Sequence, residues 1–308
     1  MAAPFPIDPY QTAIAIAYRN KKLIADSVLP RVPVGKKLFK YLEHKLSESF
    51  TIPDTKVGRK SKPNEVSFSA EGKTDSTEDH GLDDKIPHED IDQAPENFDP
   101  LGHSTESLTN LILLGREVRT AGLVFSPASY ATDNKKTLSG SSQWSDYTNS
   151  NPYEEIMYAL DKVIMRPNVM TIGRAAFTKM SMHPKVVKAI HGNSGDSGVA
   201  TRMAIAEMLE LDEILVGEGF VNLAKKGQPV NMQRVWGNHV ALTYRDLLAR
   251  PESGATFGFT AQYGDRISGA KEDGDIGLEG GLKNRVGESV KEKVAAPDLG
   301  YFLQNVIA

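Results

Sequence analysis

The chain of 308 residues contains no cysteine. Disulfide frameworks, thiolate zinc sites and cysteine nucleophiles are therefore excluded, so stability has to come from packing and from neighbouring molecules. No segment approaches the ~18 uncharged apolar residues that a membrane-spanning helix requires. The first residues, MAAPFPIDPYQ, also lack the basic and apolar regions of a signal peptide. We therefore expect the protein to remain in the cytoplasm in which it is made.

The composition is that of a folded globular protein, with 40% hydrophobic and 25% charged residues. The length predicts two compact lobes, or one lobe that carries extensions. The net charge of -4 hides an asymmetry, because 11 acidic residues and 2 lysines between Glu71 and Asp99 give that segment a charge of -9. A short basic run precedes it, formed by Lys56, Arg59, Lys60 and Lys62. Such a run is usually a solvated surface, and it is too short to indicate nucleic-acid binding.

The hydrophobic pattern divides the chain into three parts. Residues 10–26 show the spacing of an amphipathic helix. Residues 46–100 show no sustained period and few core-forming residues, which predicts an extended arm that is ordered by something outside itself. A long helix is then expected over residues 104–125, with Ser104 and Thr105 as N-caps, and it is followed by mixed helices and strands.

The second half alternates between the two periodicities. Helices are expected over 152–166, 175–182, 184–191 and 200–211, and strands over 169–172, 214–216, 220–223, 232–236, 240–244 and 256–263. The valines at positions 286, 290 and 294 suit either element, and the flanking glycines and Pro297 favour a strand.

Motifs for catalysis or cofactor binding are incomplete. Gly72-Lys73-Thr74 lacks the glycine five residues upstream that a phosphate-binding loop needs, because Ser67 stands there. The run Gly192–Asp196 lacks the final glycine and the leading strand of a nucleophile elbow. The histidines at positions 80, 88 and 103 do not pair with other ligands at metal-site spacing. We therefore expect no catalytic residue, no cofactor and no metal.

Several stretches resemble the major capsid proteins of tailed bacteriophages, in wording and in order. They are KKTLSGSSQWSDY, NPYEEIMYALDKVI, RPNVMTIGRAAFTKMSMHPKVVKAI, ILVGEGFVNLAKKGQ, WGNHVALTYR and the terminal APDLGYFLQNVIA. Together with the helix at Met203–Leu211, the similar region extends over about two thirds of the chain. Each stretch alone is weak, and the combination is specific.

The resemblance implies the α+β capsid fold of the Hong Kong 97 type. It would divide the chain into an N-terminal arm (1–45), an extended loop (46–103), a spine helix with the peripheral domain (104–198), an axial domain (199–265) and a C-terminal segment that returns to the peripheral domain (266–308). The long aperiodic segment and the long helix, both inferred from the residues alone, agree with this division.

The resemblance also implies a function and partners. The chain would self-assemble into hexamers and pentamers of an icosahedral shell around a double-stranded DNA phage genome, in a virion assembled in the host bacterial cytoplasm. Scaffolding, portal and decoration proteins would be partners, contact with DNA would be weak and non-specific, and no membrane would be involved. Some relatives crosslink a lysine to an asparagine, but no residue here identifies the acceptor or the activating carboxylate, so that chemistry is not carried over.

The charge asymmetry predicts a contact between subunits, in which the basic run lies on the acidic segment of an adjacent copy. The candidate contact residues are Lys56, Arg59, Lys60, Lys62, Asp79, Asp83, Asp84, Glu89 and Asp90. A competing interpretation is that both runs keep a loop soluble.

Two other functions compete with a phage shell. An encapsulin-like cellular compartment would share the fold and enclose enzymes instead of a genome. A serine hydrolase that uses Ser194 with His183 or His191 is the alternative from a different class.

Overall fold

The computed structural model describes residues 5–18, 20–43, 52–59, 61–65, 71–192, 198–225, 227–249 and 254–308. The helices are α1 (Pro9–Ala17), α2 (Ala25–Val28), α4 (His88–Asp92), α5 (Pro100–Val124), α6 (Pro152–Lys162), α7 (Arg174–Ser181), α8 (Pro184–His191) and α9 (Arg202–Met208). The strands are β1 (Arg31–Val34), β2 (Leu38–Glu43), β3 (Glu71–Ser76), β4 (Glu78–Pro87), β5 (Lys135–Thr137), β6 (Val169–Gly173), β7 (Glu213–Gly217), β8 (Phe220–Asn222), β9 (Met232–Arg234), β10 (Val240–Thr243), β11 (Gly258–Asp273), β12 (Gly281–Val294) and β13 (Gly300–Gln304).

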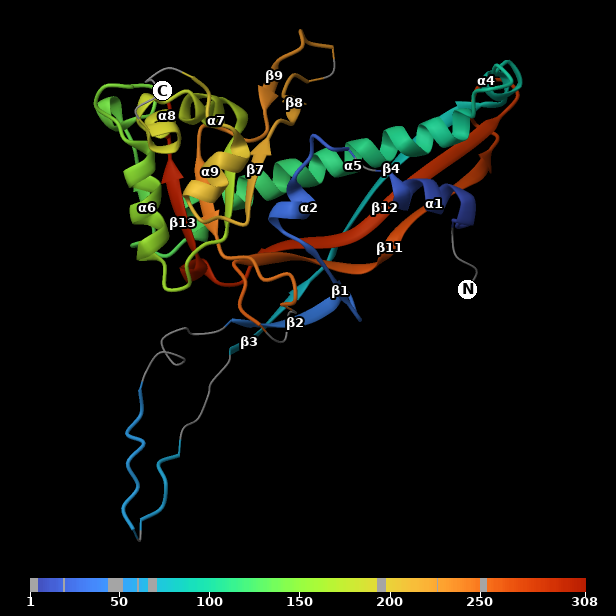
Figure 1. The fold of residues 1–308 in the computed structure, drawn as a ribbon. Helices are drawn as coiled ribbons and strands as arrows, with labels where there is room; N and C mark the ends of the chain where they lie inside the picture. The colour runs from blue at the N-terminus through green and yellow to red at the C-terminus, as the bar shows by residue number, and fades with distance from the viewer. Residues whose placement is uncertain are drawn as a thin grey trace.

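An elongated lobe is built on the strand order β1-β11-β12-β4. The long hairpin of β11 and β12 forms its centre, and α5 runs alongside the sheet for much of its length (Figure 1). A small apolar cluster joins α1, α5 and β12, through Ala15, Leu108, Ile112 and Val286. The apolar contact between helix and sheet is therefore short relative to the length of the lobe.

Helix α5 is the predicted long helix, and it begins four residues earlier than expected. Asp99 is the N-cap, since its carboxylate accepts the N–H of Leu101 at 3.0 Å, and Pro100 occupies the first turn. The predicted caps lie inside the helix instead, and the Ser104 hydroxyl donates to Asp84 at 2.7 Å. The 25 residues of α5 make a rod of about 37 Å at 1.5 Å per residue.

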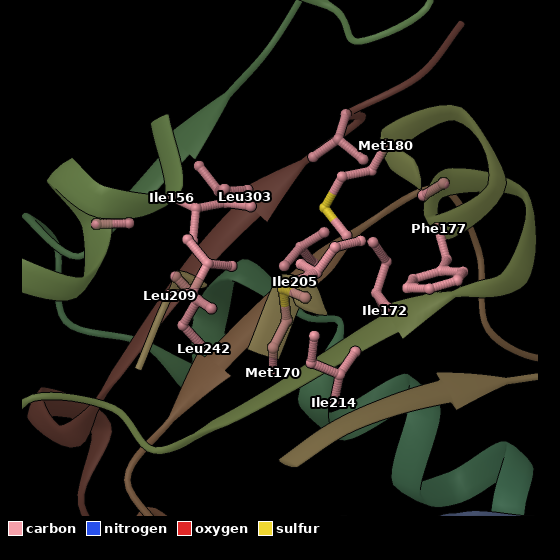
Figure 2. Close-up of a cluster of buried hydrophobic side chains, with 14 of the residues drawn as sticks. Ile156, Met170, Ile172, Phe177, Met180, Ile205, Leu209, Ile214, Leu242 and Leu303 are labelled. Atoms are coloured by element: carbon pink, nitrogen blue, oxygen red, sulfur yellow. The ribbon is translucent and has the colours of Figure 1, made fainter. Parts of the chain in front are cut away.

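A second lobe, the sheet lobe, has the strand order β5-β13-β10-β6-β7. Strands β6 and β10 are buried along their whole length, as expected for apolar strands covered on both faces. Helices α6, α7, α8 and α9 cover one face, where Ile156, Phe177, Met180 and Ile205 point toward side chains of the strands (Figure 2). The C-terminal half of α5 packs on the other face through Ala121 and Val124.

The sheet lobe takes strands from three of the predicted domains. Strand β6 falls in residues 104–198, β7 and β10 fall in 199–265, and β13 falls in 266–308. Pairing across the boundaries is regular, since β6 is parallel to β7 and β10 is antiparallel to both β6 and β13. Strand pairing therefore groups these residues differently from the division implied by the resemblance, because the strands that pair are remote in sequence.

The residues of the predicted extended loop, 46–103, lie in two different places in the structure. Strands β2 and β3 form a two-stranded ribbon, and the described residues 52–59 and 61–65 continue beyond it, away from both lobes (Figure 1). Residues 78–103 belong to the elongated lobe instead, because β4 pairs with β12 over ten residue pairs.

The first predicted helix is also too long. Helix α1 ends at Ala17, and the separate short helix α2 begins at Ala25, where the backbone N–H groups of Ile24 and Ala25 donate to the Glu117 side chain at 3.0 and 2.7 Å. The strand expected at Val286, Val290 and Val294 is confirmed as β12, and the helices expected in the second half are confirmed as α6, α7, α8 and α9.

Candidate subunit interface

The first half of the acidic segment is neutralised in part within its own subunit. Strand β12 is basic and lies antiparallel beside β4, so it places cations opposite the carboxylates. The ion pairs of the segment are Asp75 with Lys293 at 2.9 Å, Glu78 with Lys291, Asp79 with Lys37 at 2.5 Å, and Asp83 with Arg285 at 2.6 Å and with Lys283 at 3.1 Å. Of these carboxylates, Glu78 and Asp83 join β4 to β12 and therefore help to fix the register of the two strands.

The electrostatic effect of this pairing is clearest at Asp83. Hydrogen bonds donated by the Arg285 guanidinium lower the pKa of Asp83 to about 2. The hydrogen bond from the Lys37 ammonium likewise lowers the pKa of Asp79. Exposed pairs of this kind contribute only ~0 to 1 kcal/mol each, so they specify geometry more than stability.

The predicted contact residues are spread over two distant parts of the subunit. Lys56, Arg59 and Lys62 are exposed on the projecting loop, whereas Lys60 lies outside the described residues. Asp79 and Asp83 have the partners given above, and the Asp84 carboxylate accepts the Ser104 hydroxyl. Glu89 and Asp90 lie exposed on α4, at the opposite end of the elongated lobe (Figure 1). One subunit therefore does not bring the basic and acidic residues together.

An acidic tip remains at the end of the elongated lobe. The His88 N–H donates to the Gly280 carbonyl at 3.1 Å, and this bond holds α4 against the turn between β11 and β12. The tip consists of the exposed carboxylates of Glu89, Asp90, Asp92, Asp275 and Glu279. Within the described part of the chain, none of these five carboxylates forms an ion pair. The acidic tip thus gathers exposed carboxylates from α4 and from the turn between β11 and β12 whose charge the described part of the subunit does not neutralise.

Sequence reasoning missed a buried charged cluster between α5 and the sheet of the elongated lobe. Arg116 is fully buried, and it donates to the Leu29 carbonyl at 3.1 Å and to the Thr260 hydroxyl at 2.9 Å, besides its ion pair with Asp26. Glu288 binds Arg31 at 2.9 Å and Arg266 at 3.0 Å.

Burial alone would raise the pKa of Glu288, but the positive charges of Arg31 and Arg266 outweigh it and lower the pKa. The sequence held a signal for the cluster, because Arg116 falls four residues after Ile112 and four before Thr120 on the buried stripe of α5. A charged residue on a buried stripe indicates a charged partner elsewhere.

Glu117 joins three parts of the subunit. Its carboxylate accepts the N–H groups of Ile24 and Ala25 from the N-terminal segment and the indole N–H of Trp236 at 2.5 Å from the sheet lobe. Burial raises the pKa of Glu117. Trp236 packs closely on Gly217, where a Cβ would lie 2.1 Å from the indole ring. The contact between the three parts of the subunit therefore depends on Glu117, Trp236 and Gly217.

The serine–histidine alternative is not supported by the position of His183. Its Nδ1 accepts the Lys185 N–H at 3.2 Å, so Nε2 carries the proton and donates to the Ser150 hydroxyl at 3.0 Å. Burial lowers the pKa of this histidine to about 4, and the side chain caps α8. An imidazole whose free lone pair is already used does not activate a serine. Ser194 lies outside the described residues, and His191 is exposed at the end of α8.

Neither a metal cluster nor a membrane span is found among the residues that the structure describes. No group of three or more candidate ligands gathers there, and no helix there has the length and apolarity to cross a bilayer. The histidines have other surroundings: His88 binds Glu272 at 3.0 Å, and His103 packs against Phe98.

Comparison with known proteins decides the family. No protein-family model matches the chain. The chain is 58% identical to the major capsid protein of Pseudomonas phage JBD67 over 306 residues, 99% of both chains. It belongs to the phage major capsid proteins. A second relative, the major capsid protein of Burkholderia phage BcepMu, is 29% identical over 77% of this chain and 76% of its own. The chain is accordingly a structural subunit of a capsid shell and not an enzyme.

Solved structures show the same fold. A phage-related protein from Bordetella bronchiseptica RB50 matches this capsid subunit with a TM-score of 0.78 and 24% identity over 99% of both chains. The capsid of cyanophage P-SCSP1u matches with a TM-score of 0.61 and 10% identity, over 94% of this chain and 89% of its own. The SrpI encapsulin of Synechococcus elongatus shares the fold as well, with a TM-score of 0.55 and 12% identity over 95% and 92%. The fold alone does not separate a phage shell from an encapsulin; the sequence relationship does.

Proposed function

We propose that copies of this chain form hexamers and pentamers of a closed icosahedral shell of the Hong Kong 97 type, which encloses a double-stranded DNA genome. The shape of the subunit supports this proposal, because a rod-like lobe with a projecting loop offers different surfaces on its two ends. Such surfaces make head-to-tail contacts, and these contacts close into rings when the rotation between copies allows it.

The observation that carries the proposal is the separation of two complementary charged surfaces. Lys56, Arg59 and Lys62 are exposed on the projecting loop, and the acidic tip lies at the far end of the elongated lobe. We propose that the basic run of one copy contacts the acidic tip of the next copy. Each exposed pair contributes only ~0 to 1 kcal/mol, but repetition around a closed lattice multiplies a weak contact.

Reversal of the loop charges tests this contact. The variant with Lys56→Glu, Arg59→Glu, Lys60→Glu and Lys62→Glu is expected to yield few particles by sedimentation and negative-stain microscopy, because like charges then face each other. Adding Glu89→Lys, Asp90→Lys and Asp92→Lys to the same chain is expected to restore particles.

A matched control reverses exposed cations of the sheet lobe, at Lys162, Lys179, Lys188 and Arg202. Normal assembly of the loop variant would refute the contact. Failure of the unmodified chain to form any shell, alone or with the other capsid genes of its phage, would refute the proposed function as a whole.

We further propose that assembly takes place in the cytoplasm of the host bacterium with scaffolding, portal and decoration proteins, and that DNA contact is weak and non-specific. The net charge of -4 supports weak DNA contact, because non-specific DNA binding depends on neutralising phosphates with an excess of cations. Mass spectrometry of particles isolated from infected cells, repeated at low and high salt, tests both statements.

A further inference from the structure

Strand β4 is an open edge of the elongated sheet. The sheet order ends at β4, so its only strand partner is β12. The His88 N–H, one residue beyond the strand, donates to the Gly280 carbonyl of the β12 side. Because backbone groups alternate in direction along a strand, the even-numbered residues 78 to 86 point toward β12. The N–H and C=O groups of Asp79, Gly81, Asp83 and Lys85 then point outward.

Two further observations confirm this direction. Thr77, an odd-numbered residue, donates its N–H to the Lys37 carbonyl at 2.9 Å, on the side away from β12. The last residue of the strand is Pro87, which has no N–H to leave unpaired on that side. Between these two ends, the outward N–H and C=O groups of the four odd-numbered residues 79 to 85 have no backbone partner in the described part of the chain. All four residues are exposed.

The opposite edge of the same sheet is closed to pairing. The Thr260 N–H donates to the Pro30 carbonyl at 2.8 Å, so the outward positions of β1 are Arg31 and Pro33. The four-residue β1 therefore presents a single outward N–H, at Arg31. Short edge strands and edge prolines are the usual protection against unwanted pairing. The subunit has this protection at β1 and lacks it from Asp79 to Lys85.

The projecting loop of a second copy has the features of an added strand. Residues 54–58, DTKVG, are proline-free and exposed, and they contain the β-branched Thr55 and Val57. The Lys56 N–H donates to the Asp54 carboxylate at 3.0 Å in the free loop, and strand pairing would replace this bond. Their neighbours Arg59 and Lys62 belong to the basic run. Strand β4 leads directly into α4 at Pro87, so a loop whose cations rest on the acidic tip brings residues 54–58 to the β4 edge.

We propose that residues 54–58 of one copy pair with the outer edge of β4 in the next copy and extend its sheet by one strand. This inference rests on the proposed function and specifies its geometry. Backbone hydrogen bonds supply the contact, and the charges of the basic run and the acidic tip set its position along the strand.

Proline substitution at an outward position tests the pairing without breaking the β4–β12 bonds. Lys85→Pro removes one outward N–H, and Lys85→Thr removes the same charge but keeps the N–H. The proline variant is expected to give at least about tenfold fewer particles, because a net ~1 kcal/mol hydrogen bond is lost at every repeat of the contact. The threonine variant is expected to assemble like the unmodified chain. Gly81→Pro with Gly81→Ala provides a second matched pair, and equal melting temperatures of the unassembled subunits establish that the fold is intact.

Disulfide trapping identifies the paired segment, since the chain has no native cysteine. Lys85→Cys is combined in turn with Thr55→Cys, Lys56→Cys and Val57→Cys, and the assembled particles are oxidised. At least one combination is expected to give a ladder of linked subunits on a non-reducing gel, and the single-cysteine variants are not.

The outcomes separate the strand pairing from the proposed function. Particles that form normally with the proline variants and give no ladder would overturn the strand pairing and leave the shell function standing. Loss of particles in the proline variants without any ladder would mean that another segment occupies the edge, which overturns the assignment to residues 54–58.

Discussion

The two lobes of this capsid subunit are held together by different interactions. The sheet lobe has a continuous apolar core between β6, β10, β13 and its four helices, and that core is closed within one chain. The elongated lobe has two smaller apolar clusters, one between α1, α5 and β12 and one around Phe39, Tyr41 and Phe259, and it adds buried ion pairs within its sheet and between α5 and β12. A lobe with little apolar area gains less free energy on folding alone. We infer that the sheet lobe is the self-sufficient unit and that the elongated lobe depends on neighbouring subunits.

The largest effect is expected from a cavity in the sheet lobe. Ile172→Ala removes a fully buried side chain of β6 and is expected to lower the free energy of unfolding by about 4 kcal/mol. Ile112→Ala in the small cluster of the elongated lobe is the comparison, and it is expected to cost about half as much because fewer apolar neighbours surround it. Urea unfolding of unassembled subunits measures both. Equal losses would remove the contrast between the lobes.

A somewhat smaller effect is expected from the charged cluster. Glu288→Gln leaves Arg31 and Arg266 without their shared anion, and it is expected to cost about 3 kcal/mol of unfolding free energy. Glu279→Gln, on the exposed acidic tip, is the control and is expected to change stability very little. A loss below ~1 kcal/mol at Glu288 would show that its ion pairs with Arg31 and Arg266 contribute little to the stability of the elongated lobe.

As the pH falls, the sheet lobe is expected to lose stability first and the elongated lobe at lower pH. The pKa of His183 is lowered to about 4 in the folded chain, whereas an unperturbed histidine titrates near ~6.5. The unfolded chain therefore binds more protons between these values, and the sheet lobe loses about 2 kcal/mol as the pH falls from ~6.5 toward 4. The pKa values of Asp26 and Glu288 are lowered as well, so the elongated lobe loses stability only below ~4.5, as these carboxylates are protonated.

Hydrogen exchange of the unassembled subunit as a function of pH distinguishes the lobes. Protection in β6 and α8 is expected to fall first, and His183→Asn is expected to remove this early loss while still capping α8. Simultaneous loss of protection in both lobes above pH ~5 would contradict the assignment of the early loss to His183 and of the later loss to Asp26 and Glu288.

The smallest effect is expected at the exposed pairs of β4. Asp83→Asn removes a carboxylate bound to Arg285 and Lys283, and it is expected to lower the unfolding free energy by less than ~1 kcal/mol, because solvent screens exposed pairs. Thermal unfolding at low and high salt checks this value. A loss comparable to that at Glu288 would show that β4 is held by charge and not mainly by its backbone ladder.

The sequence predicted the elements that local signals define. A proline marks the start of both α6 and α8, acidic residues follow it in α6, and apolar spacing identifies α5, so these helices lie close to where they were expected. The resemblance also predicted the capsid fold and the shell function. The contact residues between subunits remain predictions, because one chain places them far apart.

The errors occur where a partner remote in sequence determines the structure. The segment EDHGLDDKIP has no apolar alternation, yet it forms β4 because Asp83 and its neighbours face Arg285 and the rest of β12, about 200 positions away. The predicted first helix is divided between α1 and α2, and the start of α2 is fixed by Glu117, about 90 positions away, which binds the backbone N–H groups of Ile24 and Ala25. The division into domains stays a prediction, and the strands β6, β10 and β13 pair across its boundaries.

The two tryptophans of the chain occupy positions that make them an intrinsic optical gauge. Trp144 is enclosed in the sheet lobe, whereas the indole of Trp236 binds Glu117 where the lobes meet. A change in the angle between the lobes alters the surroundings of Trp236 and leaves those of Trp144 constant. Emission from a Trp144→Phe variant therefore follows the movement of the joint in unlabelled subunits while shells form.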